Sequence, residues 1–164
     1  MNSSVSCHPA LPAAFFIVQH LAAEATGDAL LHKLGRRKTF KCKLASDGES
    51  FENGTIYIAP VDYHLLVKKT TLKVTKGARE NRYRPAVDPL FRSAAVAHGA
   101  GVIGVVLTGM LDDGTAGLVA IQKCGGITVV QEPKDAAYPE MPQSALNHLQ
   151  SRSCGQDARN GPFA

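Results

Sequence analysis

The sequence predicts an α/β protein built on a mostly parallel sheet, with an antiparallel ribbon inserted into it. Three short apolar runs, each rich in Val, Ile or Phe, are typical of strands buried on both faces; they occupy residues 14–19, 102–108 and 127–131. Helical patterns follow the first two runs, at 24–34 and 115–124. Because strands that alternate with helices pair in parallel, these observations favour the α/β class.

Length and composition are those of one ordered globular domain. The 164 residues suffice to bury a core, and a content of 45% hydrophobic and 20% charged residues excludes overall disorder. No apolar run reaches the ~20 residues that a membrane helix needs, and the N-terminus lacks the basic start of a signal peptide. We therefore expect a cytoplasmic protein without membrane insertion. The four cysteines form no C-x-x-C pair, which excludes a zinc ribbon or a thioredoxin motif.

The N-terminal third predicts an arm, a strand, a helix and a second strand. Residues 1–13 predict an irregular arm, because small polar residues and two prolines fill them. The helix over 24–34 carries its leucines at helical spacing, and Gly35 is a plausible stop. Residues 39–44 alternate polar and apolar side chains, as a half-exposed strand does.

The middle of the chain predicts the antiparallel ribbon. Residues 55–60 favour a further strand, and residues 63–68 with 71–75 favour a hairpin. Asp-Gly and Asn-Gly turns lie between the earlier strands, so we expect the whole stretch 39–75 to form the ribbon. The basic segment 76–88 predicts irregular structure.

The C-terminal half predicts further helices. Pro at the first position favours a helix over 89–98, and a second helix is expected over 115–124. Residues 144–149 predict a short final helix, and the polar, Gly-rich residues 151–164 predict a disordered tail. These expectations define one domain over 14–150.

The net charge of +4, from 18 basic and 14 acidic residues, is unevenly placed. Two clusters hold the excess: Arg36, Arg37, Lys38, Lys41 and Lys43, then Lys68, Lys69, Lys73, Lys76, Arg79, Arg82 and Arg84. They are either solvated loops and strand edges or a surface for an acidic partner. Nucleic acid is not expected as that partner, because aromatic residues make up only 6%, Trp is absent and no stacking motif is present.

Polar side chains follow two of the predicted buried strands. His20 comes directly after the run 14–19, and Asp112 and Asp113 lie in the turn after 102–108. Because the carboxyl ends of parallel strands meet at one edge of a sheet, we expect His20 and Asp113 within hydrogen-bonding distance. Alone, such a histidine is usually structural and such an aspartate is usually a helix N-cap. Together they favour a pair in which the carboxylate orients the imidazole.

Neither a metal nor a cofactor site is predicted. The histidines form no H-x-x-x-H pair; they are His8, His20, His32, His64, His98 and His148. A G-x-G-x-x-G run at 99–104 follows a predicted helix and precedes a strand. A dinucleotide fingerprint has the opposite order.

Several segments together match one protein family. They are Ile-Val-Gln-His (17–20), Ile-Tyr-Ile-Ala-Pro (56–60) with Asp-Tyr-His (62–64), Arg-Pro-Ala-Val-Asp-Pro-Leu-Phe (84–91), Leu-Thr-Gly-Met-Leu-Asp-Asp-Gly (107–114) and Met-Pro (141–142). On these segments the chain resembles the catalytic domain of the bacterial chemotaxis protein-glutamate methylesterase. The resemblance covers roughly residues 11–147 in the family's order.

The resemblance implies a Ser-His-Asp esterase on a doubly wound sheet, without a cofactor. Such an enzyme hydrolyses glutamate γ-methyl esters on methyl-accepting chemotaxis receptors and deamidates certain receptor glutamines. His20 matches the family's catalytic histidine, and Asp113 matches its catalytic aspartate. Asp112 stands where the family varies, which favours a turn or capping role.

The nucleophile is not found where the resemblance places it. The family opens with a strand and a G-x-S-x-G-G turn, and the return to the histidine takes about 17–24 residues. Only 19 residues precede His20, so we expect the first family strand to be missing and the domain to be truncated at its front. Ser3, Ser4 and Ser6 lie in no glycine-rich turn, so the nucleophile stays unassigned, with Ser6 a residual candidate. The alternative function is an inactive module that binds a receptor or another protein.

Overall fold

A computed structural model describes residues 12–20, 28–36 and 40–156. The strands are β1 (Phe15–Ile17), β2 (Lys41–Leu44), β3 (Thr55–Ile58), β4 (His64–Val67), β5 (Leu72–Thr75), β6 (Ile103–Val106) and β7 (Ile127–Val130). The α-helices are α1 (Asp28–Gly35), α2 (Val87–His98), α3 (Thr115–Lys123) and α4 (Glu140–Gln156), and two 3₁₀ turns are η1 (Gly99–Gly101) and η2 (Pro133–Asp135). The alternation of short strands and helices is that of the predicted α/β class.

The strands form two parallel sheets and one antiparallel hairpin. The first sheet has the order β1-β3-β2, with Phe15 opposite Ile56 and Lys41 opposite Thr55. The second sheet pairs β6 with β7, and the hairpin pairs β4 with β5. Among the described residues no strand pairs with the second edge of β1 or of β6. Within the described residues, β1 and β6 are therefore edge strands of their sheets.

The antiparallel ribbon is shorter than the sequence predicted. The expectation of a ribbon over 39–75 is wrong for its first half, because β2 and β3 run parallel and only β4 and β5 are antiparallel. The link from β2 to β3 contains two turns, with Gly48 and Gly54 at positive φ. Between those turns the link bridges to the start of β5, through Ser50 and Thr71. Each turn reverses the direction of the chain, so after the two turns β3 runs parallel to β2.

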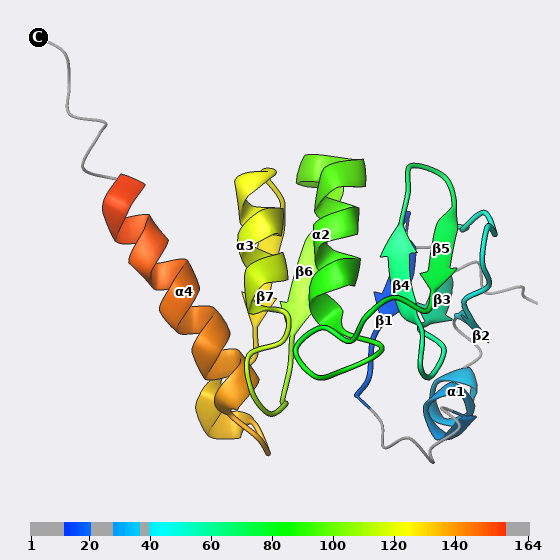
Figure 1. The fold of residues 1–164 in the computed structure, drawn as a ribbon, viewed down its shortest axis with the longest axis horizontal. Helices are drawn as coiled ribbons and strands as arrows, with labels where there is room; N and C mark the ends of the chain where they lie inside the picture. The colour runs from blue at the N-terminus through cyan, green and yellow to red at the C-terminus, as the bar shows by residue number, and fades with distance from the viewer. Residues whose placement is uncertain (1–11, 21–27, 37–39, 157–164) are drawn as a thin grey trace, which may run out of the picture.

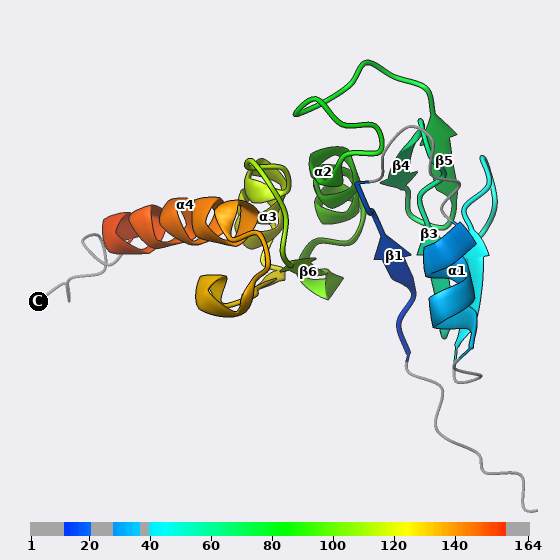
Figure 2. The same cartoon turned by 90° about the horizontal axis from the view of Figure 1, so that it is seen from below.

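Helices α2 and α3 lie side by side on one face of the β6–β7 sheet, and α4 begins beside α3 and slants away from it (Figure 1). Seen from below, the β4–β5 hairpin lies on the same side as these helices, and α1 lies apart from them beside β2 (Figure 2). Helix α2 touches both β4 and α3. It therefore joins the two halves of the molecule.

The core has two parts that meet at α2. One part gathers around β3 and the hairpin, and the other lies between α2, α3 and β6. Val18, Phe91 and Val102 pack against both parts. Since Phe91 belongs to α2, this helix carries the apolar contact between the sheets.

The sequence predicted that the apolar strands are buried on both faces, and this prediction is wrong. In β6, Gly104 and Val106 point into the core, whereas Ile103 is 63% exposed. Ile127 of β7, which pairs with Ile103, is 57% exposed. Strand β1 is half-buried throughout. Helices cover one face of the β6–β7 sheet, and within the described residues no element covers its other face. Side chains along β6 and β7 therefore alternate between buried and exposed positions, although nearly all of them are apolar.

Several predicted ends move. Helix α2 begins at Val87, two residues before the predicted start, and Pro89 fits in its first turn, where no helical N–H is needed. The predicted short helix over 144–149 is part of α4, which continues to Gln156 through the first six residues of the predicted tail. Residues 1–11, 21–27, 37–39 and 157–164 lie outside the described residues, so the predicted arm, the start of the predicted helix over 24–34 and the basic residues Arg37 and Lys38 are not described. No described helix is long and apolar enough to cross a bilayer.

We predict that Gly117→Ala destabilises the protein by about 1–3 kcal/mol, because an overpacked contact costs that much. A Cβ on Gly117 would lie 2.5 Å from Cβ of Phe91, where α2 and α3 touch. Helix propensity alone predicts the opposite sign, since Ala is favoured over Gly by about 1 kcal/mol in a helix interior. Gly35→Ala is the matched control, because a Cβ there meets nothing within 4 Å. Urea unfolding measures both variants, and a Gly117→Ala variant as stable as Gly35→Ala would contradict the packing.

Candidate functional site

The carboxyl ends of β1 and β6 lead into the two residues that the sequence places in a pair. His20 follows β1, and Asp113 lies in the turn between β6 and α3. Nε2 of His20 lies 2.7 Å from Oδ2 of Asp113, so the predicted contact is present. Asp113 is 1% exposed, whereas the His20 ring keeps partial contact with solvent.

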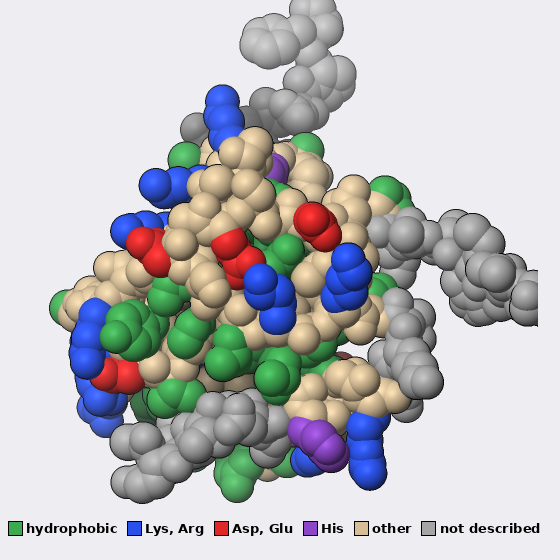
Figure 3. All heavy atoms as spheres, turned by 90° about the vertical axis from the view of Figure 1, so that its right-hand side faces the viewer, with side chains coloured by type: hydrophobic (Ala, Val, Ile, Leu, Met, Phe, Trp, Pro, Cys, Tyr) green, Lys and Arg blue, Asp and Glu red, His purple; other side chains and the backbone are tan. Residues whose placement is uncertain are grey.

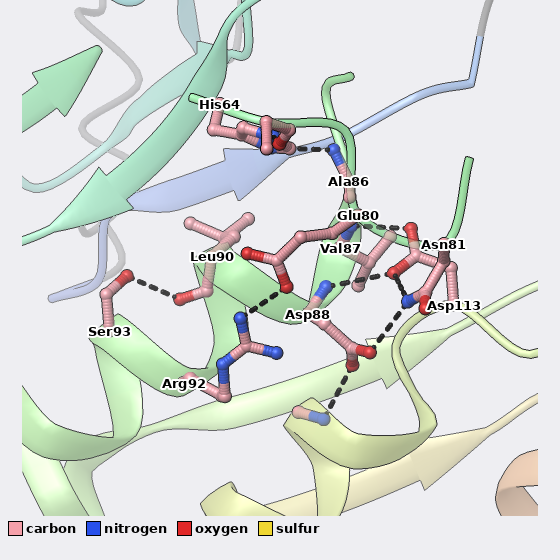
Figure 4. Close-up of polar contacts among 12 residues, drawn as sticks. His64, Glu80, Asn81, Ala86, Val87, Asp88, Leu90, Arg92, Ser93 and Asp113 are labelled. Carbon is pink, nitrogen blue, oxygen red and sulfur yellow. Dashed lines mark hydrogen bonds and ion pairs between the residues drawn. The ribbon is translucent and has the colours of Figure 1, made fainter. Parts of the chain in front are cut away.

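The carboxylate of Asp113 accepts four hydrogen bonds. Besides His20, Oδ2 accepts one from the main-chain N–H of Val87 at 2.7 Å. Oδ1 accepts one from the N–H of Asp88 at 3.1 Å and one from the side-chain amide of Asn81 at 2.9 Å (Figure 4). Burial by itself raises the pKa of Asp113, but these hydrogen bonds outweigh burial and hold the pKa below its usual value. Because Val87 and Asp88 open α2, the charge also lies at the positive end of a helix.

A second buried carboxylate, that of Asp88, lies beside the first. Its Oδ1 accepts a hydrogen bond from the N–H of Gly117 at 2.6 Å, and its Oδ2 accepts one from the Asn81 amide at 2.8 Å. Burial raises the pKa of Asp88, the negative charge of Asp113 adds to the rise, and the two hydrogen bonds only partly offset it. The amide of Asn81 thus bridges two buried acids (Figure 4).

Asn81 belongs to a tight turn that also carries an aromatic neighbour of His20. Glu80 and Tyr83 exchange main-chain hydrogen bonds of 3.1 and 2.8 Å. Between them Asn81 and Arg82 have φ values of 50° and 70°, the combination of a type I′ turn. The ring of Tyr83 stacks on the ring of His20, with centroids 3.7 Å apart and planes 5° apart. Glu80 forms an ion pair with an arginine of α2, so the turn is tied to the helix.

The chain on either side of this turn is held by buried or paired polar groups. Arg84 donates to Oδ1 of Asp62 at 2.6 and 2.9 Å and to the carbonyl of Gly77 at 2.6 Å. His64 is buried, with Nε2 2.8 Å from the carbonyl of Ala78 and Nδ1 accepting the N–H of Ala86. His64 therefore has a structural role beside the site.

The other sequence candidates lie elsewhere. Asp112 is exposed, and its main-chain carbonyl accepts a hydrogen bond from the N–H of Thr115, in keeping with the predicted turn role. Ser3, Ser4 and Ser6 lie outside the described residues. In the part of the chain that is described, no serine forms a hydrogen bond with His20, and no group of three His, Cys, Asp or Glu side chains could hold a metal ion.

Three residues of the site were not predicted from the sequence: Asn81, Tyr83 and Asp88. Asp88 lies within residues 84–91, one of the segments that match the family. The resemblance therefore pointed to this segment, but it gave Asp88 no role. Asn81 and Tyr83 lie ahead of that segment in a stretch predicted only as basic and irregular. Their contacts depend on a turn whose two central residues are Asn81 and Arg82, whereas such turns are usually signalled by Asn-Gly.

A buried carboxylate that faces an imidazole is one part of the Ser-His-Asp constellation, which recurs on unrelated folds. Residues 3–156 match the family model described as CheB methylesterase. The chain therefore belongs to the CheB methylesterase family.

Individual relatives agree with this assignment. The chain is 39% identical over 153 residues to a putative protein-glutamate methylesterase/protein-glutamine glutaminase of Leptospira interrogans, and the match covers 89% of this chain and 78% of the relative. It is 39% identical over 138 residues to protein-glutamate methylesterase/protein-glutamine glutaminase 3 of Anaeromyxobacter dehalogenans, of which it spans only 40%. The crystal structure of the Thermotoga maritima CheB methylesterase catalytic domain superposes with a TM-score of 0.79 at 32% identity, over 84% of this chain and 75% of that one.

We predict that Asp113→Asn lowers the free energy of unfolding most at pH 7 and least near pH 3. The folded pKa of Asp113 lies below its unfolded value of about 3.9, so the stability from its ionised form is complete above that value and is lost as the pH falls through the folded pKa. At low pH the wild-type carboxyl is neutral and resembles the amide. Urea unfolding at several pH values measures the difference, and a difference that stays constant down to pH ~3 would contradict a depressed pKa.

Proposed function

We propose that the chain provides the acid–base part of a protein-glutamate methylesterase site, which hydrolyses glutamate γ-methyl esters and deamidates glutamines on methyl-accepting chemotaxis receptors. The observation that carries the proposal is the 2.7 Å contact between His20 and the buried carboxylate of Asp113. The names of the relatives give the reaction class. A cytoplasmic location remains a prediction.

In this proposal Asp113 orients His20 and stabilises the imidazolium that forms during turnover. His20 takes the proton of a serine hydroxyl as that oxygen attacks the ester carbonyl, and it gives the proton to the departing methanol. Water then cleaves the acyl-enzyme with His20 again as the base. The serine comes from the family resemblance and stays unassigned in this chain, with Ser6 the residual candidate.

The charges on the loop between β5 and α2 support the proposal that the partner is acidic. The one carboxylate of Asp62 lies among three cations, with Lys76 at 3.0 Å, Arg79 at 3.9 Å and Arg84 at 2.6 Å. Arg82 is exposed and forms no ion pair with any described residue. Positive charge therefore remains beside the site and favours the approach of an acidic receptor segment.

The basic residues on and near β2 and β5 are largely balanced by acidic side chains. Three of them form ion pairs: Lys41–Glu52, Lys43–Glu49 and Lys73–Asp47. Basic and acidic side chains are interspersed on the face of the molecule that carries β2 (Figure 3). This face fits a solvated surface better than a recognition surface.

A second candidate function is a binding module without hydrolytic activity. The observation that favours it is that, among the described residues, no serine forms a hydrogen bond with His20. A histidine without a hydroxyl to deprotonate has nothing to activate. Release of methanol separates the two candidates.

We predict that this 164-residue chain releases little or no methanol from methylated chemoreceptor membranes. We further predict that the chain acquires esterase activity when the family's G-x-S-x-G-G strand and its following helix are fused ahead of it. That activity should fall by orders of magnitude in His20→Ala, because removing a triad member leaves only the residual catalysis of binding and electrostatics. His98→Ala, which changes a histidine at the far end of α2, is the matched control and should keep the activity.

Methanol measured by gas chromatography decides the outcome. A fusion that folds and binds the membranes but releases no methanol contradicts the proposed chemistry and supports the binding module. Rapid release by the chain alone, abolished by His20→Ala, contradicts the expectation that this chain lacks a working nucleophile and points to Ser3, Ser4 or Ser6.

A further inference from the structure

We propose that the turn of residues 80–83 is a positioning device for His20: Tyr83 fixes the plane of the imidazole, and Asn81 fixes the carboxylate that the imidazole faces. As a result Nε2 is directed at Asp113 and Nδ1 is the nitrogen offered to the reacting groups. The inference deepens the proposed function, because it assigns the working nitrogen of the same site. Neither residue is assigned a role by the sequence motifs or by the comparisons.

The first argument is how few contacts hold the His20 ring. Among the described residues, its hydrogen bond goes to Asp113 and its ring contact goes to Tyr83. A ring held by one hydrogen bond can still turn about that bond. The stack restrains the tilt of the ring, because parallel rings with centroids 3.7 Å apart would clash if the imidazole turned out of its plane.

The second argument is the geometry of the stack. Two neutral aromatic rings prefer offset or edge-to-face arrangements to a direct face-to-face sandwich, because their quadrupoles repel. A cation over the face of a tyrosine ring is attracted by the same quadrupole. The Tyr83 ring therefore also attracts the positive charge that His20 takes up when it removes a proton from the nucleophile in the proposed reaction.

The third argument is that the turn itself is fixed. Arg82 has a φ of 70°, which non-glycine residues adopt only where the surroundings impose it. The reciprocal hydrogen bonds of Glu80 and Tyr83 close the turn, and the ion pair of Glu80 ties it to α2. Asn81 then reaches inward to both buried carboxylates. Tyr83 is presented to His20 by a turn anchored at three points.

The orientation has a consequence for the proton. With Nε2 facing a carboxylate, the neutral ring carries its proton on Nε2 and leaves the lone pair on Nδ1. Nδ1 accepts no hydrogen bond from any described residue. This polarity is the reverse of the chymotrypsin arrangement, in which the aspartate holds Nδ1 and Nε2 works on the nucleophile.

Nitrogen NMR of the full chain labelled at histidine tests the proposal without any substrate, so its failure is distinct from failure of the methanol assay. His20→Gln identifies the His20 signals. We expect the neutral wild-type ring to show the Nε2–H form, with its carbon-bound protons shifted upfield by the Tyr83 ring current. Tyr83→Phe keeps the ring and should keep both signatures.

Tyr83→Leu should lose the upfield shift and populate both tautomers. Tyr63→Leu is the matched control, because Tyr63 is a part-exposed tyrosine beside Lys76 and should leave the His20 signals unchanged. A wild-type ring in the Nδ1–H form overturns the assignment of the working nitrogen. A folded Tyr83→Leu with wild-type His20 signals overturns the role of Tyr83. If Tyr83→Leu does not fold, absence of the upfield shift in the wild type and in Tyr83→Phe overturns it instead.

Discussion

One buried negative charge organises this molecule. The carboxylate of Asp113 lies in the interior, where an unpaired charge would be prohibitive, so every group around it must supply a donor. Those donors come from three separate places: the segment after β1, the turn at 80–83 and the start of α2. The hydrogen bonds to this one carboxylate thus fix the relative positions of three distant parts of the chain.

Close packing of α2 against α3 is the condition for that arrangement. Asp113 immediately precedes α3, and it reaches the N-terminus of α2 only because glycines allow the helices to approach. A Cβ on Gly114 would lie 3.0 Å from Val87, and Gly117 donates its main-chain N–H to Asp88. The apolar contact through Phe91 and the polar contacts at the helix ends therefore support each other.

The same contacts also connect the two parallel sheets. The sheet of β1, β3 and β2 and the sheet of β6 and β7 share no ladder hydrogen bonds in the described part of the chain. They are joined by the packing of α2 and, at their carboxyl edge, by His20 and Asp113. The candidate site is thus a structural junction, so a change there affects stability as well as chemistry.

The sequence predicted the parts of this picture that depend on local pattern. Apolar runs located β1, β6 and β7, and the rule that sites lie at carboxyl ends brought His20 and Asp113 together. The sequence could not predict which faces of β6 and β7 are covered. Hydrophobic periodicity shows which side chains are apolar, but it does not show whether a helix packs against them.

The turn at 80–83 was equally out of reach of sequence patterns. Its positive φ values fall on Asn81 and Arg82, so the glycine that usually follows Asn in such a turn is absent. The burial of Asp88 depends on an N–H from α3, a contact between residues 29 positions apart. Such features are set by tertiary packing, which overrides local preference.

A double-mutant cycle tests the central claim, that Asp113 organises the molecule through its hydrogen-bonded partners. The free energies of unfolding of His20→Ala, Asp113→Asn and the double variant would be measured in urea at neutral pH. We expect the two substitutions to be coupled by about 1.5–3 kcal/mol, the range for a hydrogen bond to a charged group. Additivity within about 0.5 kcal/mol would mean that the two side chains do not interact in solution, and it would contradict the account.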